Sequence, residues 1–68
     1  MTYDDIYNYM IEVMPQYTDF VTDEVNTTFL AEDACNHFKA YIGKAKDIPF
    51  LFYDVAFEVA TNNGLNIY

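Results

Sequence analysis

Apolar residues recur at intervals of three and four along most of the chain, a spacing that places them on one face of an α-helix. In the first stretch that face is formed by Ile6, Met10, Val13 and Met14. Thr2 can cap this helix, and Asp5 three residues later completes a variant of the capping box. Because Pro15 disfavours the helical conformation at the residue before it, we expect the helix to end at about residue 14.

A second, shorter helix is expected over residues 18–25, with Phe20, Val21 and Val25 facing inward. Residues 26–28 are Asn, Thr and Thr, whose side chains compete with a helix for backbone hydrogen bonds. The pattern therefore predicts a break between this helix and the next one.

A third helix is expected to begin after Thr28, which would be its cap. Its apolar face is formed by Leu30, Ala34, Phe38 and Tyr41. Gly43 suits the left-handed position just beyond a helix C-terminus, and Lys39 would complement the helix dipole near that end.

A fourth helix is expected from Pro49, in its first turn, to about residue 62 or 63, with Gly64 ending it. It is apolar on nearly every side, and its polar stripe is formed by Asp54, Glu58 and Thr61. Such a helix either lies at the centre of a fold or packs against another subunit. The alternating tail, residues 65–68, is expected to lie across the core in an extended form. Residues 1–68 are thus predicted to form one small, compact all-α domain of about four helices.

A chain of 68 residues buries little surface, so its core needs reinforcement. Cys35 is the only cysteine, which excludes a disulfide within one chain. The remaining means are a dense aromatic core, since the chain has seven tyrosines and six phenylalanines, and self-association. We expect a symmetric homodimer that buries part of Phe50, Tyr53 and Phe57.

The distribution of charge changes the picture of function. The net charge is −8, and all of it belongs to residues 1–38, which carry eight acids and no lysine or arginine. Charge of one sign on part of a small domain steers basic partners and repels nucleic acid and anionic membranes. We therefore expect a protein partner with a basic surface, and no direct contact with nucleic acid or membrane.

The N-terminal segment and the longest apolar run indicate where the protein acts. Residues 1–8 are acidic where a secretory signal peptide would be basic. The apolar run over residues 48–60 is interrupted by acids and is too short to span a bilayer. We expect a cytoplasmic protein.

The spacing of the carboxylates resembles that of phosphates along one DNA strand. Asp5 and Glu12 are seven residues apart, about 10 Å along a helix axis, and Asp19 and Asp23 are four apart, about 6 Å. Rigid helices with carboxylates at these intervals could imitate a nucleic acid backbone. The alternative is that these charges simply face water. The candidate partner-binding carboxylates are Asp4, Asp5, Glu12, Asp19, Asp23, Glu24, Glu32, Asp33, Asp54 and Glu58.

A catalytic or metal site is hard to build from these residues. Cys35 and His37 are two apart and would point to different helix faces, so we expect Cys35 to be a small buried hydrophobe. His37 lies four residues after Asp33, but two ligands do not make a metal site. Both glycines are expected at helix ends rather than in a phosphate-binding loop. We expect no enzyme activity, no cofactor and no metal.

The tyrosines form a second candidate surface, because so short a chain cannot bury all of Tyr3, Tyr7, Tyr9, Tyr17, Tyr41, Tyr53 and Tyr68. Tyrosine is common at protein interfaces, where it offers a large contact area at little cost in rotamer entropy. The alternative function is therefore an acidic interaction module or adaptor that binds through an aromatic surface. If the tyrosines do not bind a partner, they lie at the edge of the core with their hydroxyls in water.

Several short segments resemble the Ocr-like family of phage antirestriction proteins, which are helical DNA mimics. They are the opening Met1-Thr2-Tyr3, then Tyr17 with Asp19, and later Asp47-Ile48-Pro49, Asp54-Val55, Val59-Ala60 and Gly64-Leu65. Residues 34–65 are also faintly similar to ArdA, another antirestriction family. The resemblance covers most of this chain but only about the first half of Ocr, without its long acid-rich C-terminal helix.

The resemblance implies an inhibitor that occupies the DNA-binding site of a host defence protein. By place and type, the family's mimic positions correspond to Asp19, Asp23, Glu24, Asp54 and Glu58. The partner implied is a DNA-binding protein with a basic channel, of the restriction-modification, BREX or CRISPR type. If the protein is phage-encoded, the host cytoplasm is where it would act.

Overall fold

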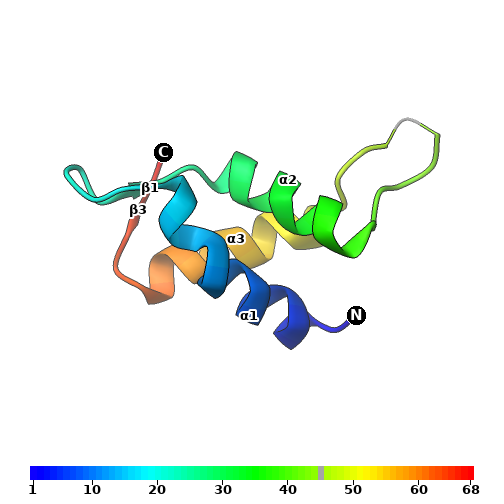
Figure 1. The fold of residues 1–68 in the computed structure, drawn as a ribbon, viewed down its shortest axis with the longest axis horizontal. Helices are drawn as coiled ribbons and strands as arrows, with labels where there is room; N and C mark the ends of the chain where they lie inside the picture. The colour runs from blue at the N-terminus through cyan, green and yellow to red at the C-terminus, as the bar shows by residue number, and fades with distance from the viewer. Residues whose placement is uncertain (45) are drawn as a thin grey trace.

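Three α-helices and a small sheet make up the part of the chain that the computed structural model describes, residues 1–44 and 46–68. The elements are α1 (Tyr3–Val13), η1 (a 3₁₀-helix, Met14–Tyr17), β1 (Thr18–Asp19), β2 (Glu24–Val25), α2 (Thr27–Phe38), α3 (Phe50–Asn62) and β3 (Asn66–Ile67). The sheet lies at one end of the molecule, beside the C-terminus (Figure 1). The fold is mostly helical, as expected, but it is not purely all-α.

The start of α1 follows the sequence closely. The Thr2 hydroxyl accepts from the Asp5 amide N–H at 3.2 Å, and the Asp5 carboxylate accepts from the Thr2 amide N–H at 2.9 Å. The hydrogen bond from the Thr2 amide to the carboxylate is the main reason that the pKa of Asp5 is lowered, and the Thr2 side chain adds to the effect. The α-helix ends at Val13, and the chain tightens into η1 with Pro15 in its first turn. The predicted boundary near residue 14 is confirmed.

Residues 18–25 form a hairpin, so the predicted second helix is wrong. β1 and β2 pair antiparallel, with Thr18 opposite Val25 and Asp19 opposite Glu24. The Asp19 carboxylate accepts from the Val21 amide N–H at 2.9 Å, and Asp23 takes the left-handed conformation with φ 57°. Short acidic side chains stabilise such turns at the expense of a helix.

The predicted inward face of this segment is wrong in two of its three residues. Phe20 and Val21 lie at the tip of the hairpin and are 63% and 94% exposed. Val25, on β2, is fully buried and belongs to the core. Strand periodicity thus directs Val25 inward while the turn carries the other two apolar residues into solvent.

The ends of α2 also differ from the sequence-based expectation. Asn26 is the cap rather than Thr28, and its side chain accepts from the Phe29 amide N–H at 3.1 Å. The helix ends at Phe38, where Lys39 takes the left-handed conformation with φ 52° that was expected at Gly43. Gly43 lies instead in the turn closed by the bridge between Ile42 and Asp47. A lysine can hold the left-handed end of a helix when two backbone bonds fix it, as they do here.

The C-terminal end of α3 is a Schellman motif centred on Gly64, which has φ 69°. The Gly64 amide N–H donates to the Thr61 carbonyl at 3.1 Å, and the Leu65 amide N–H donates to the Ala60 carbonyl at 2.9 Å. The tail then runs extended as β3, parallel to β2, as predicted, but Asn66 and Ile67 are exposed in the sheet rather than lying across the core. Gly64 is therefore the helix stop that the sequence predicted.

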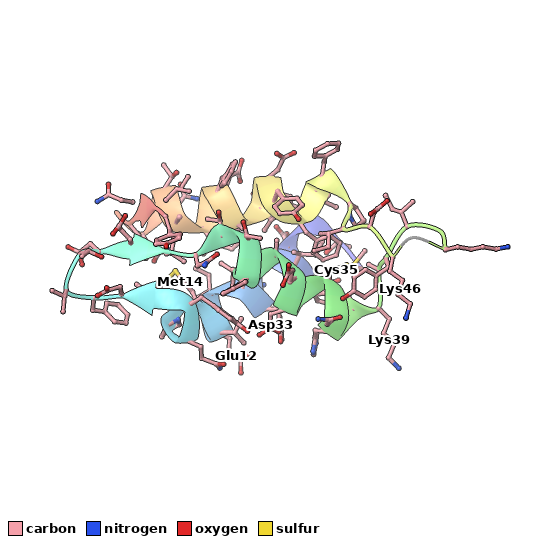
Figure 2. The ribbon with its side chains drawn as sticks, turned by 90° about the horizontal axis from the view of Figure 1, so that it is seen from above. Glu12, Met14, Asp33, Cys35, Lys39 and Lys46 are labelled. Carbon is pink, nitrogen blue, oxygen red and sulfur yellow. The ribbon has the colours of Figure 1, made fainter. Side chains whose placement is uncertain are left out.

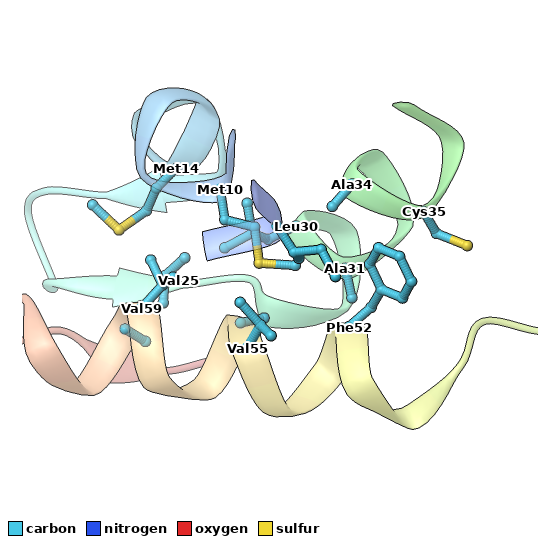
Figure 3. Packing of buried hydrophobic residues seen from close by; sticks show 13 residues of the cluster. Met10, Met14, Val25, Leu30, Ala31, Ala34, Cys35, Phe52, Val55 and Val59 are labelled. Carbon is cyan, nitrogen blue, oxygen red and sulfur yellow. The ribbon is translucent and has the colours of Figure 1, made fainter. Parts of the chain in front are cut away.

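The core lies between α3 and the pair formed by α1 and α2 (Figure 3). Phe52 is its largest fully buried side chain, and α3 also contributes Val55, Ala56, Val59 and Ala60. α3 packs against both other helices, which accounts for the apolar residues of its buried face, while Phe50, Leu51 and Phe57 of the same helix are exposed. None of the helices in the described ranges is long and apolar enough to cross a bilayer.

Candidate functional site

Asp33 on α2 is the centre of the most elaborate polar contact in the described structure. Tyr9 of α1 donates its hydroxyl to one carboxylate oxygen at 2.5 Å, and Tyr17 of η1 donates to the other oxygen. The hydrogen bond to Asp33 is the main reason that the pKa values of both tyrosines rise to about 12, and burial adds to it. This half-buried carboxylate therefore links three elements by two charge-assisted hydrogen bonds.

The ring of His37 covers one side of this contact. It stacks on the Tyr9 ring with centroids 3.9 Å apart and an angle of 15° between the planes, and Phe38 meets both rings edge-on. His37 thus contacts two aromatic rings, those of Tyr9 and Phe38. Within residues 1–44 and 46–68 no group of three or more His, Cys, Asp or Glu side chains could hold a metal ion.

Two further carboxylates lie close to the same tyrosines. The negative charge of Glu12 contributes to the raised pKa of Tyr9, and that of Glu32 contributes to the raised pKa of Tyr17. Both glutamates are exposed, and Figure 2 shows Glu12 and Asp33 on the same side of the molecule. We call Glu12, Glu32 and Asp33 the α1–α2 acidic cluster.

Three other predicted carboxylates belong to the hairpin, and we call Asp19, Asp23 and Glu24 the hairpin carboxylates. Asp19 and Asp23 are exposed at either end of the turn, and Glu24 is half-buried on β2. The Asp23 carbonyl accepts from the Asn66 amide N–H at 2.7 Å, which fixes the hairpin to the C-terminal strand. The 3₁₀-helix η1 connects the two groups: it contacts α2 and leads along the chain into β1.

The remaining four candidates lie elsewhere. Asp4 and Asp5 occupy the first turn of α1, where Asp5 belongs to the capping box. Asp54 and Glu58 are exposed on α3, whose outer side chains project away from the side that carries Glu12 and Asp33 (Figure 2). The ten predicted carboxylates therefore form separate groups rather than one continuous row.

The lysines lie far from the hairpin. Lys39 ends α2, and Lys44 and Lys46 belong to the loop between α2 and α3. Figure 2 places Lys39 and Lys46 at the end of the molecule opposite the hairpin. The three lysines therefore lie apart from the hairpin carboxylates, in a molecule whose longest dimension is 38 Å.

The aromatic residues predicted at a dimer interface are partly accessible. Phe50 and Phe57 are 85% and 44% exposed, while Tyr53 is half-buried against the core. Several tyrosines have partners within the chain: Tyr41 donates to Asn36, and the Tyr7 hydroxyl accepts from the Asn62 amide at 3.1 Å. Exposed aromatic residues also occur outside α3, since Phe20, Phe29 and Tyr68 are 63%, 54% and 81% exposed.

Cys35 is fully buried, as expected for a small hydrophobe, and burial raises the pKa of its thiol. A buried protonated thiol is a poor nucleophile. The surface formed by the described residues contains no pocket.

Comparison with protein-family models, curated proteins and solved structures finds no match to this chain.

The contact at Asp33 was not foreseen from the sequence, which placed this residue among surface charges. The available signal was its position on α2, three residues after the buried Leu30 and immediately before the buried Ala34. A carboxylate at the margin of an apolar face requires a hydrogen-bond donor, and two tyrosines supply it here.

Proposed function

We propose that this protein is a phage-type inhibitor that occupies the DNA-binding surface of a host defence protein through carboxylates. One observation carries the proposal: Glu12, Glu32 and Asp33 gather around Tyr9 and Tyr17, and the hairpin carboxylates follow in the next elements, within a stretch that has no lysine or arginine. A basic DNA-binding channel is the kind of protein surface that such a field attracts. The resemblance to Ocr-like proteins agrees with this proposal.

Two of these six carboxylates are held in place by hydrogen bonds, which supports mimicry over simple solubility. Asp33 is fixed by two tyrosine hydroxyls, and Asp19 is fixed by the Val21 amide. A fixed charge loses less conformational entropy on binding than a flexible one. Occupancy would be the whole mechanism, with no turnover and no cofactor.

The separation of the groups narrows the proposed surface. Asp54 and Glu58 are exposed on α3 rather than on α1, α2 or the hairpin, so they would contribute long-range steering rather than contact. The mimic surface proposed here therefore has six carboxylates instead of ten.

A pair of matched variants tests this assignment once the target has been recovered from a bacterial lysate. Asp19→Asn with Asp23→Asn removes two charges from the hairpin, and Asp4→Asn with Asp47→Asn removes two exposed charges outside the proposed surface. Asparagine preserves the turn because it forms the same side-chain bond and tolerates the left-handed conformation.

We expect the double substitution in the hairpin to weaken binding about tenfold or more and the control substitutions to weaken it about twofold or less. The reason is that charges in contact with the partner contribute more to affinity than distant ones. Equal losses would mean that only net charge matters, and the proposed surface would then be wrong.

The alternative function is an acidic adaptor whose aromatic surface supplies the binding energy. The exposure of Phe50 and Phe57 favours it. Salt distinguishes the two functions, because a phosphate mimic loses affinity steeply as ionic strength rises and an aromatic interface loses much less.

A further inference from the structure

The outer face of α3 combines the exposed rings of Phe50 and Phe57 with the half-buried Tyr53, which also packs against the core. Phe50, Tyr53 and Phe57 are spaced by three and four residues, so they follow one side of the helix over two turns. The buried face of the same helix, which includes Phe52 and Val55, points into the core. We call Phe50, Tyr53, Asp54 and Phe57 the α3 outer face.

A carboxylate interrupts this face at its middle. Asp54 lies four residues after Phe50 and three before Phe57, which places it between their side chains. Glu58 follows Asp54 by four residues and extends the acidic row along the helix. Both charged residues of α3 are acids, so the face presents aromatic rings together with negative charge only.

A second copy of the chain fits this face poorly. In a dimer whose two-fold axis crosses the middle of the face, Asp54 would lie against Asp54 of the other copy. Bringing two like charges together and removing their hydration water is strongly unfavourable. The dimer would also combine two net charges of −8, giving −16 in total.

We infer that the α3 outer face docks a basic amphipathic helix of a partner protein. Apolar side chains of that helix would cover Phe50 and Phe57, and a lysine or arginine one turn away would pair with Asp54. The aromatic rings favour the same occupant, because cations bind to their faces. The α3 outer face and the mimic surface have no residue in common and belong to different elements, so the inference does not depend on the proposed function.

A synthetic peptide of leucine and lysine at amphipathic helical spacing is a suitable probe. It is titrated into the isotope-labelled full chain, and amide shifts are followed by nuclear magnetic resonance. We expect saturable shifts along residues 50–58, and no binding by a peptide in which glutamate replaces every lysine. Shifts confined to the α1–α2 acidic cluster, or equal binding of the glutamate peptide, would overturn the inference.

Variants separate this site from general attraction to an acidic protein. Asp54→Asn should weaken the peptide about tenfold, and Glu12→Gln, which removes the same charge from the other side, about twofold or less. Phe57→Ser should abolish saturable binding while circular dichroism keeps its helical signal. Equal effects of Asp54→Asn and Glu12→Gln would contradict the inference.

Sedimentation tests the competing occupant. We expect the unmodified chain to sediment as a monomer of 7.9 kDa. A dimer that Phe57→Ser dissociates would show that a second copy covers this face and would overturn the inference.

Discussion

Asp33 illustrates how a single carboxylate can join several elements of a fold. Its carboxylate accepts from Tyr9 and Tyr17, and so ties α1, η1 and α2 together at the margin of the core. A charged acceptor makes stronger hydrogen bonds than a neutral one, particularly where water is partly excluded. The same contact holds a negative charge in a fixed position at the surface, which a binding site for cationic groups requires.

Replacing Asp33 by asparagine should therefore destabilise the fold. An amide offers one acceptor oxygen in place of two and carries no charge, so one tyrosine hydroxyl loses its partner and the other is held more weakly. We expect a loss of about 2 kcal/mol in the free energy of unfolding. Urea denaturation measures it, with Glu32→Gln on the same helix as the control, expected within about 0.5 kcal/mol of the unmodified chain. A smaller loss for Asp33→Asn than for the control would contradict this role.

The two tyrosines should also titrate late. Their pKa values of about 12 in the folded chain exceed the ordinary value of 10, so the neutral phenols are favoured by folding. The stability that they contribute is fully present below pH 10 and is lost as the pH rises towards 12. Ultraviolet titration of tyrosinate should show a late component that Asp33→Asn moves back towards 10. A single common transition for all seven tyrosines would refute the contact.

At the scale of elements, the sequence predicted those parts whose signals are local and uncontested. The Thr2–Asp5 box and the Gly64 stop were recognised because each satisfies the ends of its own helix. The prediction of a helix over residues 18–25 is wrong because the apolar residues there have helical spacing while the acids between them favour a turn. The strand conformation is favoured by pairing with β3, which lies more than forty residues away along the chain. Patterns within a short window of sequence carry no information about this pairing.

The hairpin makes a prediction that a helix would not. Phe20→Ser and Val21→Thr alter exposed side chains, so each should change the free energy of unfolding by less than about 0.5 kcal/mol. Val25→Ala, in the core, should cost about 2 kcal/mol because it leaves a cavity. Urea denaturation of the three variants checks this. A loss of several kcal/mol for Phe20→Ser would indicate that the residue is buried and the hairpin wrong.

For the molecule as a whole, the uneven distribution of charge along the sequence gives an uneven distribution of charge over the surface. The sequence has no lysine or arginine before Lys39, and this predicts an acidic surface. The sequence does not predict how the acids are grouped, because the grouping depends on which sides of α1, α2 and α3 remain exposed after packing. Packing divides the predicted ten-residue set between the α1–α2 side with the hairpin, the start of α1 and the outer side of α3.

The central claim is that the α1–α2 acidic cluster and the hairpin carboxylates take the place of DNA on a defence protein. Competition measures it most directly: the purified target is loaded with labelled duplex DNA, and this protein is added at rising concentration. We expect the DNA to be displaced in full, with a midpoint that moves to higher concentration as salt is raised. A ternary complex, in which DNA and this protein bind the target at the same time and independently, would contradict the claim.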